Sequence, residues 1–347
     1  MPRVFFGCYT DGAPFFADAR GRGILRSGFD EDTGRFTPPE WCADIVNPSW
    51  LCASGRGDLL AVSETFRAPG RVLRFGLTDS GPLIPRGDAS SEGLATCHVA
   101  DAGDFAFAAS YLDGRLTAYS LAGGGLAGPT AIHTYEGRGP DADRQTCAHA
   151  HHVAISPWTG HLCVCDLGSD AVWVHPPYTG EALAAPVRIP APPGSGPRHG
   201  LFHPLLPLFY VVTELDPQVL VYDVHSRDGA LTLRDVIRLR ELPGLDSAGG
   251  GAALRLHPDS EQLALSERSG HRVALFHLDR EGRPRLERVV APDRPTDRTP
   301  RDIAFSPGGN WLLIAYQDGH RIRAVPLAPT SHETSVNVGS PSCIAFA

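Results

Sequence analysis

A segment of eight residues recurs seven times along this chain, and this repeat constrains the fold more than any other feature. Successive copies start 41 to 54 residues apart, at Pro48, Thr96, Ala150, Pro197, Gly251, Pro300 and Pro341, the last being cut short by the chain end. Each copy alternates in polarity and ends in a turn, which is typical of a short, half-buried strand. Internal repeats of this length indicate a solenoid, a propeller or a similar array.

Two further strand-like segments follow each complete copy of the repeat. Second strands are predicted at residues 58–64, 105–111, 161–167, 208–214, 262–268 and 311–317, and third strands at 71–77, 115–121, 171–177, 218–224, 272–278 and 321–327. Gly, Asp and Pro lie between them, as tight hairpins require. The pattern predicts an all-β fold, a seven-bladed β-propeller with four-stranded antiparallel blades.

The two chain ends complement each other. The seventh copy, at residues 341–347, has no second or third strand after it, whereas residues 3–10 and 22–29 resemble a second and a third strand without a first. Combining them closes the ring and leaves no open sheet edge. We therefore expect a single domain over residues 1–347, with a closing blade built from both termini.

Composition excludes several classes of function. The formal net charge of −8 argues against a general binder of nucleic acid or of membrane surfaces. All 31 basic residues are arginine, which excludes lysine Schiff-base chemistry and makes any cationic clamp a guanidinium.

No stretch approaches the ~18 apolar residues of a membrane span, and the N-terminus does not resemble a signal peptide. The eight cysteines form no CxxC pair, which favours reduced, buried thiols in a cytoplasmic protein. Nothing in the sequence indicates an oligomeric state.

The repeat gathers polar residues at one mouth of the central channel. In a blade, the start of the first strand and the end of the second, antiparallel strand open on the same face of the ring. The second positions of the repeats hold Ser49, Cys97, His151, Arg198, Ala252, Arg301 and Ser342, and the second strands end at Thr10, Glu64, Tyr111, Leu167, Glu214, Arg268 and Gln317. Polar groups that converge from different blades around a cavity predict a small-molecule site.

Three histidines in the stretch "CAHAHH" lie at this mouth. In extended chain His149 points the same way as His151, whereas His152 points oppositely, so the first two are expected to face the channel. The two could serve as ligands of a zinc-like ion with a nearby glutamate. The arginines around the same cavity oppose a bound cation, and we therefore expect neither a metal nor another cofactor.

Several longer motifs carry a family resemblance. These are "FFGCYT", "AHAHHVAISP", "GSGPRHGLFHP" followed by "TEL", and "TPRDIAFSPGGNWLLIAYQDGHRI". Over nearly its whole length the chain resembles the seven-bladed lactonase family, which includes propeller-type 6-phosphogluconolactonases and fungal-type carboxymuconate lactonising enzymes. Two departures, His152 in place of a small residue and "SYLDG" in place of an Asn-Tyr pair, prevent the transfer of a specific substrate.

The resemblance implies catalytic roles for four residues that the repeat also places at the mouth: His151, Arg198, Glu214 and Arg268. We expect His151 to act as general base or acid, supported by Glu214, while the two arginines bind and polarise the substrate. Further substrate-binding candidates are His149, His199, Arg301, Glu64 and Gln317, although His199 lies at a strand–turn junction where a packing role also fits.

The predicted function is hydrolysis of a small sugar-acid or carboxylate lactone. Two alternatives remain open at this point: a cycloisomerase that runs lactone formation, and a non-catalytic propeller that binds a protein or peptide. The sequence contains no Gly-rich phosphate cradle, and arginines bind a carboxylate as well as a phosphate, so a phosphate on the substrate is not specified.

Overall fold

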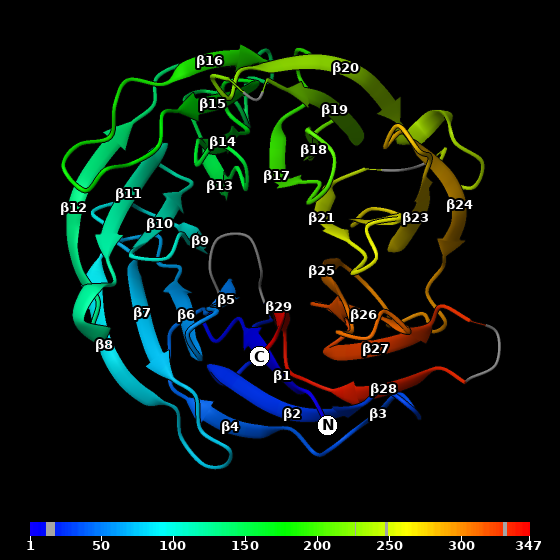
Figure 1. The fold of residues 1–347 in the computed structure, drawn as a ribbon. Coiled ribbons are helices and arrows are strands. Elements are labelled where there is room, and N and C mark those ends of the chain that lie inside the picture. Colours follow the sequence, from blue (N-terminus) through cyan, green and yellow to red (C-terminus); the bar gives the residue numbers. More distant parts are fainter. Residues whose placement is uncertain (12–17, 226, 247–248, 329–331) are drawn as a thin grey trace.

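Seven antiparallel sheets surround a central axis in the computed structural model, which describes residues 1–11, 18–225, 227–246, 249–328 and 332–347. Figure 1 shows the sheets as blades of a ring, with one strand of each blade nearest the centre and one at the rim. Six sheets contain four strands, and the sheet that holds both chain ends contains five. The prediction of a seven-bladed β-propeller is confirmed.

The innermost strands are β5 (Leu51–Ala53), β9 (Thr96–Asp101), β13 (Ala150–Ile155), β17 (Pro197–Phe202), β21 (Gly251–Leu256), β25 (Pro300–Phe305) and β29 (Pro341–Phe346). The second strands are β6 (Asp58–Ser63), β10 (Phe105–Ser110), β14 (Leu162–Asp166), β18 (Leu208–Thr213), β22 (Gln262–Glu267), β26 (Trp311–Tyr316) and β1 (Arg3–Cys8). The third strands are β7 (Arg71–Gly76), β11 (Arg115–Ser120), β15 (Ala171–His175), β19 (Gln218–Val224), β23 (Arg272–Leu278), β27 (Arg321–Pro326) and β2 (Ile24–Asp30).

The outermost strands are β8 (Ile84–Ser90), β12 (Ala127–Thr134), β16 (Val187–Pro190), β20 (Leu231–Arg238), β24 (Pro284–Val290) and β28 (Thr334–Asn337), together with β3 (Arg35–Phe36) and β4 (Glu40–Ala43), which both pair with β2. Two short 3₁₀ turns, η1 (Ala122–Gly124) and η2 (Leu239–Glu241), complete the described elements. In the described ranges no helix is long and apolar enough to cross a membrane.

The closing blade joins the two ends of the chain, as predicted. Strand β29 pairs antiparallel with β1, with Val4 opposite Phe346 and Phe6 opposite Ile344, and β1 in turn pairs with β2. The last innermost strand is therefore held by the first strand of the chain. Because β29 pairs on one side of β1 and β2 on the other, both edges of β1 are paired and the ring closes through backbone hydrogen bonds.

For six of the seven innermost strands, the repeat predicts the correct first residue. The exception is β5, which begins at Leu51 and not at Pro48. There Asn47 adopts a left-handed conformation with φ of 46°, and its carbonyl accepts a hydrogen bond from the backbone of Ser49 at 2.7 Å. This turn occupies the residues that begin a strand in the other blades.

The second strands form the core because each is covered on both faces by neighbouring blades. All residues of β6, β18 and β26 are buried. At the seam between β26 and the closing blade, the indole of Trp311 packs edge-on against Phe29 and donates a hydrogen bond to the carbonyl of Glu31 at 2.7 Å. Gly34, with φ of 70°, lies over this indole, and a Cβ there would come within 2.3 Å of the ring.

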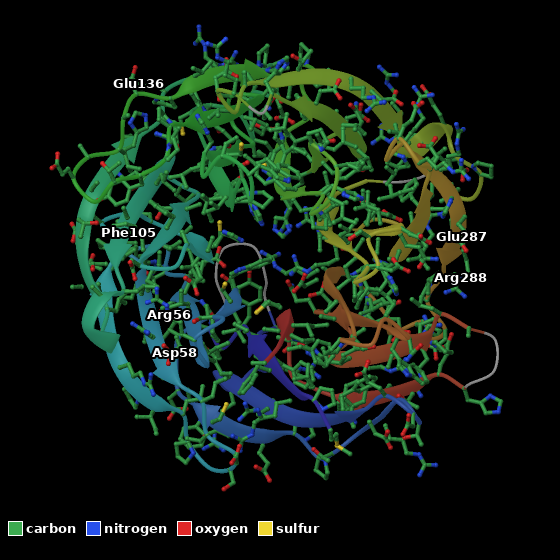
Figure 2. The ribbon with its side chains drawn as sticks, viewed as in Figure 1. Arg56, Asp58, Phe105, Glu136, Glu287 and Arg288 are labelled. Carbon is green, nitrogen blue, oxygen red and sulfur yellow. The ribbon has the colours of Figure 1, made fainter. Side chains whose placement is uncertain are left out.

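The outermost strands, in contrast, carry mostly exposed side chains, and their positions could not be derived from apolar alternation. Residues of β8 are largely exposed, and Figure 2 shows Glu287 and Arg288 of β24 at the rim of the ring. A strand with one pairing edge and a solvated surface has no periodic apolar signal.

The eight cysteines are all free. Six are buried, Cys52 is partly buried and Cys147 is exposed, so the expectation of buried thiols holds for most of them.

Candidate active site

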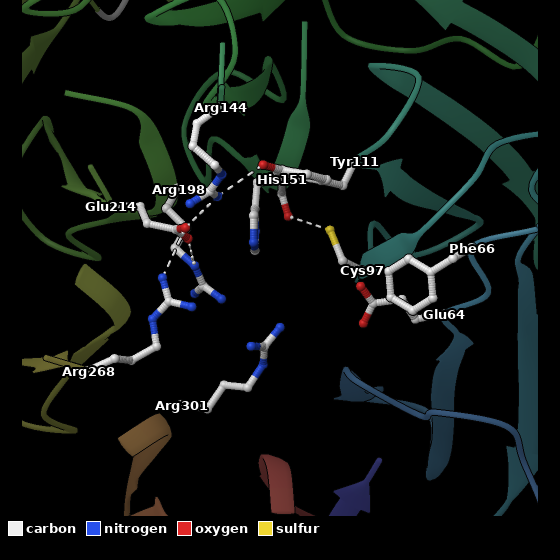
Figure 3. A pocket seen from close by; sticks show the side chains of 10 residues that line it. All are labelled: Glu64, Phe66, Cys97, Tyr111, Arg144, His151, Arg198, Glu214, Arg268 and Arg301. Atoms are coloured by element: carbon white, nitrogen blue, oxygen red, sulfur yellow. Dashed lines mark hydrogen bonds and ion pairs between the residues drawn. The ribbon is translucent and has the colours of Figure 1, made fainter. Parts of the chain in front are cut away.

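A cavity of about 300 Å³ opens at the centre of the ring (Figure 3). It is lined by ten residues: Glu64, Phe66, Cys97, Tyr111, Arg144, His151, Arg198, Glu214, Arg268 and Arg301. Eight of them stand at the second position of a repeat or directly after a second strand. The prediction that these two positions open on the same face of the ring is therefore confirmed.

A repeated backbone irregularity directs the innermost side chains into the cavity. Ala150 and His152 both pair with β14, whereas His151 between them is an extra, unpaired residue. The register skips Arg198 in β17 and Arg301 in β25 in the same way. Such bulges turn one side chain out of the regular alternation of a strand. The second position of the repeat is thus a β-bulge that places its side chain at the channel mouth.

Three arginines converge on one carboxylate. Glu214 accepts hydrogen bonds at Oε1 from Nη2 of Arg144 at 2.7 Å and at Oε2 from Nε of Arg198 at 2.8 Å, and its Oε1 forms an ion pair with Nη2 of Arg268 at 2.9 Å. Burial alone would raise the pKa of Glu214, but the guanidiniums of these three residues hold it well below its usual value. Glu214 is therefore an ionised carboxylate that fixes three guanidiniums.

Arg198 is the most enclosed of these arginines, with only 3% of its side chain exposed. Its Nη1 donates to the backbone carbonyl of Ala252 at 2.6 Å and to Nε2 of His199 at 2.9 Å. Burial lowers its pKa to about 10, which leaves the guanidinium charged at neutral pH. Its Nη2 has no partner among the described residues, so it has unused donors at the cavity.

His151 lies between the arginines and Cys97 and is 7% exposed. Its ring meets those of Tyr111 and His199 at centroid distances of 5.7 and 5.4 Å, and its Nδ1 is buried without a partner in the described ranges. Burial, followed by the charge of Arg198, holds the pKa of His151 well below its usual value. The imidazole is therefore neutral at pH 7, which is the form that a general base requires.

A second, much smaller hollow of about 10 Å³ continues inward from His151. It shares five residues with the larger cavity and adds Ser49, Trp50, His199 and Ser342. Ser49 Oγ and His199 Nδ1 are buried and have no partner among the described residues. A polar hollow of this size has room for about one water molecule.

Arg301 lies on the side of the cavity away from Glu214. Its guanidinium lies 4.9 Å above the ring of Tyr9, whose hydroxyl donates to Oε2 of Glu64 at 3.0 Å. Arg301 itself makes no hydrogen bond or ion pair with any described residue, and Figure 3 shows it apart from the other three arginines. Four arginines and two glutamates line the cavity, so its formal charge is positive and favours an anionic ligand.

Comparison with known proteins identifies the family. The family model described as "Lactonase, 7-bladed beta-propeller" matches residues 3–346. The chain belongs to the seven-bladed β-propeller lactonases. It is 24% identical to the 6-phosphogluconolactonase of Bacillus subtilis (strain 168), over 99% of this chain and 97% of that protein. It is 29% identical to the 6-phosphogluconolactonase of Klebsiella pneumoniae (strain 342), over 73% of each.

A solved lactonase structure has the same fold. The periplasmic gluconolactonase of Pseudomonas aeruginosa superposes with a TM-score of 0.88 at 28% identity, covering 100% of this chain and 99% of that one.

The structure brings together most of the site residues expected from the sequence. Six line the large cavity: His151, Arg198, Glu214, Arg268, Arg301 and Glu64. His199 lines the inner hollow. Glu214, expected to support His151, hydrogen-bonds the arginines and makes no described bond to that histidine.

Two candidates lie outside the cavity lining. The ring of His149 stacks on Tyr111 at 4.4 Å, and its Nδ1 lies 2.8 Å from the carbonyl of the same residue. The prediction that His149 points into the cavity with His151 is wrong, because the bulge at His151 breaks the two-residue alternation of side chains. Gln317 donates to Asp318 at 2.9 Å. His152, expected to point away from the cavity, packs its ring against those of His98, Trp50 and His199.

Four lining residues were not predicted as site residues. Cys97 and Tyr111 occupy repeat positions that face the mouth, so the repeat itself could have identified them. Arg144 and Phe66 come from loops outside the repeat, and nothing in its pattern indicates them. Within the described part of the chain, no three His, Cys, Asp or Glu side chains are arranged to hold a metal ion.

Proposed function

We propose that this protein hydrolyses a small, negatively charged lactone at the cavity around His151. The observation that carries this proposal is a neutral imidazole beside arginines with unused donors, in a cavity of a lactonase-family propeller. Water is the nucleophile, and the inner hollow next to His151 has the size and the polar lining to hold it.

In the proposed reaction, water attacks the lactone carbonyl carbon while His151 takes one of its protons. The carbonyl oxygen becomes negatively charged, and unused donors of Arg198 and Arg301 stabilise it. When the intermediate collapses, the ring carbon–oxygen bond breaks and the leaving alkoxide takes the proton from the imidazolium. The product is an open-chain hydroxy acid, and His151 returns to its neutral form.

Glu214 has a positioning role in this proposal. Both of its oxygens accept hydrogen bonds from guanidiniums, and its charge is needed to hold three arginines close together. Held in this way, the guanidinium of Arg198 can stabilise the developing negative charge without rearrangement during the reaction. Arg268, whose Nη1 has no described partner, is the proposed contact for the body of the substrate.

The names of the relatives supply two lactones to test. 6-Phosphogluconolactone carries the negative charge that the proposal requires, whereas gluconolactone is uncharged and serves as the comparison. The cycloisomerase alternative has no support from these relatives. A non-catalytic binder would use exposed loops such as residues 240–251, of which 247–248 lie outside the described residues. The cytoplasmic location stays a prediction, and the Pseudomonas aeruginosa relative is described as periplasmic.

A pH-indicator assay with 6-phosphogluconolactone, gluconolactone and a muconolactone tests the proposed reaction. We expect proton release on at least one of them above the buffer rate, unchanged by chelator and abolished in Arg198→Ala. The matched control is Arg138→Ala, an exposed arginine away from the cavity lining. Absence of proton release on all three lactones would reject the proposal, and loss of activity with chelator would indicate a metal site.

A further inference from the structure

One arginine of the cavity comes from outside the repeat. Arg144 lies in the β12–β13 segment (residues 135–149), which joins two blades and has no counterpart among the repeat positions. It nevertheless lines the large cavity. Its location raises the question of what an additional guanidinium does beside a carboxylate that already holds two.

The β12–β13 segment is built to present Arg144 in a fixed position. Oδ1 of Asp141 accepts hydrogen bonds from the backbone of Asp143 and of Arg144, each at 3.0 Å. Gln145 is 1% exposed, and its Nε2 donates to the carbonyl of Leu167 and to Asp170, each at 2.8 Å. The residues on both sides of Arg144 are thus tied to the loop itself and to the neighbouring hairpin.

One edge of the Arg144 guanidinium is occupied and the other is free. Nη2 donates to Glu214 Oε1 at 2.7 Å and to the hydroxyl of Tyr111 at 3.1 Å. Nε and Nη1 have no partner among the described residues. A planar guanidinium held on one side offers its remaining donors in a fixed direction, which suits recognition of a carboxylate or a phosphate.

Arg144 lies at the outer end of the site. Its side chain is 42% exposed, compared with 3% for Arg198. Arg301 and His151 line both the large cavity and the inner hollow, whereas Arg144 lines only the large cavity. The large cavity thus has room for a lactone to extend from His151 toward Arg144.

We propose that Arg144 is a specificity-determining residue that binds an anionic group, carboxylate or phosphate, at the end of the substrate remote from the lactone carbonyl. The proposal rests on the proposed function for the orientation of the substrate. In this proposal Arg144 of the β12–β13 segment selects substrates with a charged remote group, and the residues of the repeat carry out the reaction.

Equilibrium binding of three open-chain sugar acids tests this role without turnover. Gluconate has no remote charge, glucarate carries a remote carboxylate, and 6-phosphogluconate carries a remote phosphate. By isothermal titration calorimetry we expect the wild-type protein to bind glucarate or 6-phosphogluconate about 10- to 100-fold more tightly than gluconate. Whichever of the two is preferred identifies the remote group.

Arg144→Gln is expected to erase this preference while leaving gluconate affinity within about threefold. Arg138→Gln is the matched control, because Arg138 belongs to the same segment, is exposed and does not line the cavity. Arg144→Lys should keep part of the preference, since it keeps the charge without the planar fork.

Equal weakening of all three ligands in Arg144→Gln would overturn the proposal, because it would show that Arg144 acts only by supporting Glu214. Absence of the preference in the wild-type protein would overturn it as well. If the preference is present and lost in Arg144→Gln while no lactone is hydrolysed, the proposed reaction fails and the binding role of Arg144 stands.

Discussion

The two sides of the cavity use the same residue type in different ways. On one side Arg144, Arg198 and Arg268 all form ion pairs with Glu214, whereas on the other Arg301 is free of hydrogen bonds and ion pairs with the described residues. An arginine fixed by a carboxylate has a defined geometry, but part of its charge is already balanced. An arginine without a partner keeps its whole set of donors for a ligand. The difference separates residues that shape the site from one that is available to the reacting group.

Among the variants that compare the two sides of the cavity, the largest effect is expected from Glu214→Gln, which removes the charge that holds Arg144, Arg198 and Arg268 together. Three guanidiniums would then lie close together with no shared carboxylate. We expect the free energy of unfolding to fall by about 3 kcal/mol, as for other buried pairs that lose one partner. We expect kcat/KM to fall about 10³-fold. Urea unfolding and lactone hydrolysis measure the two quantities, and a stable, fully active variant would contradict the role given to Glu214.

Arg301→Gln should separate activity from stability. Because Arg301 has no ion pair with a described residue, its removal is expected to change the free energy of unfolding by less than about 1 kcal/mol. Loss of a donor to the carbonyl oxygen should lower kcat/KM about 10²-fold. The same two assays decide the outcome. A marked loss of stability would show that Arg301, like the three arginines paired with Glu214, helps to hold the structure together.

The two variants should shift the pH dependence of activity in opposite directions. Arg301 lowers the pKa of His151 and Glu214 raises it, although burial is the largest cause of the overall depression. A general base works in its neutral form, so activity is lost as pH falls through the pKa of His151. The acidic limb of kcat/KM should therefore move to higher pH in Arg301→Gln and to lower pH in Glu214→Gln. Shifts in the same direction, or none, would argue against His151 as the titrating base.

The smallest effect is expected from Gln317→Ala. Gln317 follows directly after a second strand, as Glu214 does, but it does not line the cavity, and its side-chain Nε2 donates to Asp318. We expect kcat/KM to change by less than about threefold. A larger loss in the hydrolysis assay would extend the site toward the end of β26.

Much of this architecture follows from the repeat. The copies that start at Ala150, Pro197 and Pro300 coincide with β13, β17 and β25, and the second position of each carries a cavity side chain. A position defined by alignment of seven copies is accurate because every blade must pack against the next one in the same register. The pairing of β29 with β1 follows from the same requirement.

Other features depend on local geometry that the repeat does not encode. The bulge at His151 breaks strand parity, and His149 consequently packs on Tyr111 and not into the cavity. Arg144 reaches Glu214 only because the β12–β13 segment folds around Asp141 and Gln145, and an irregular loop has no periodic signal. The outermost strands were not located either, since their exposed side chains need no apolar alternation.

The most direct test of the account is the hydrolysis rate of His151→Gln, measured on the lactone that the wild-type protein turns over fastest. Gln occupies similar space and forms hydrogen bonds, but it cannot take a proton from water at neutral pH. If His151 is the base, kcat should fall about 10²- to 10⁴-fold, with an unchanged unfolding transition. A His151→Gln protein that hydrolyses the lactone at the wild-type rate would contradict the assignment of His151 as the base.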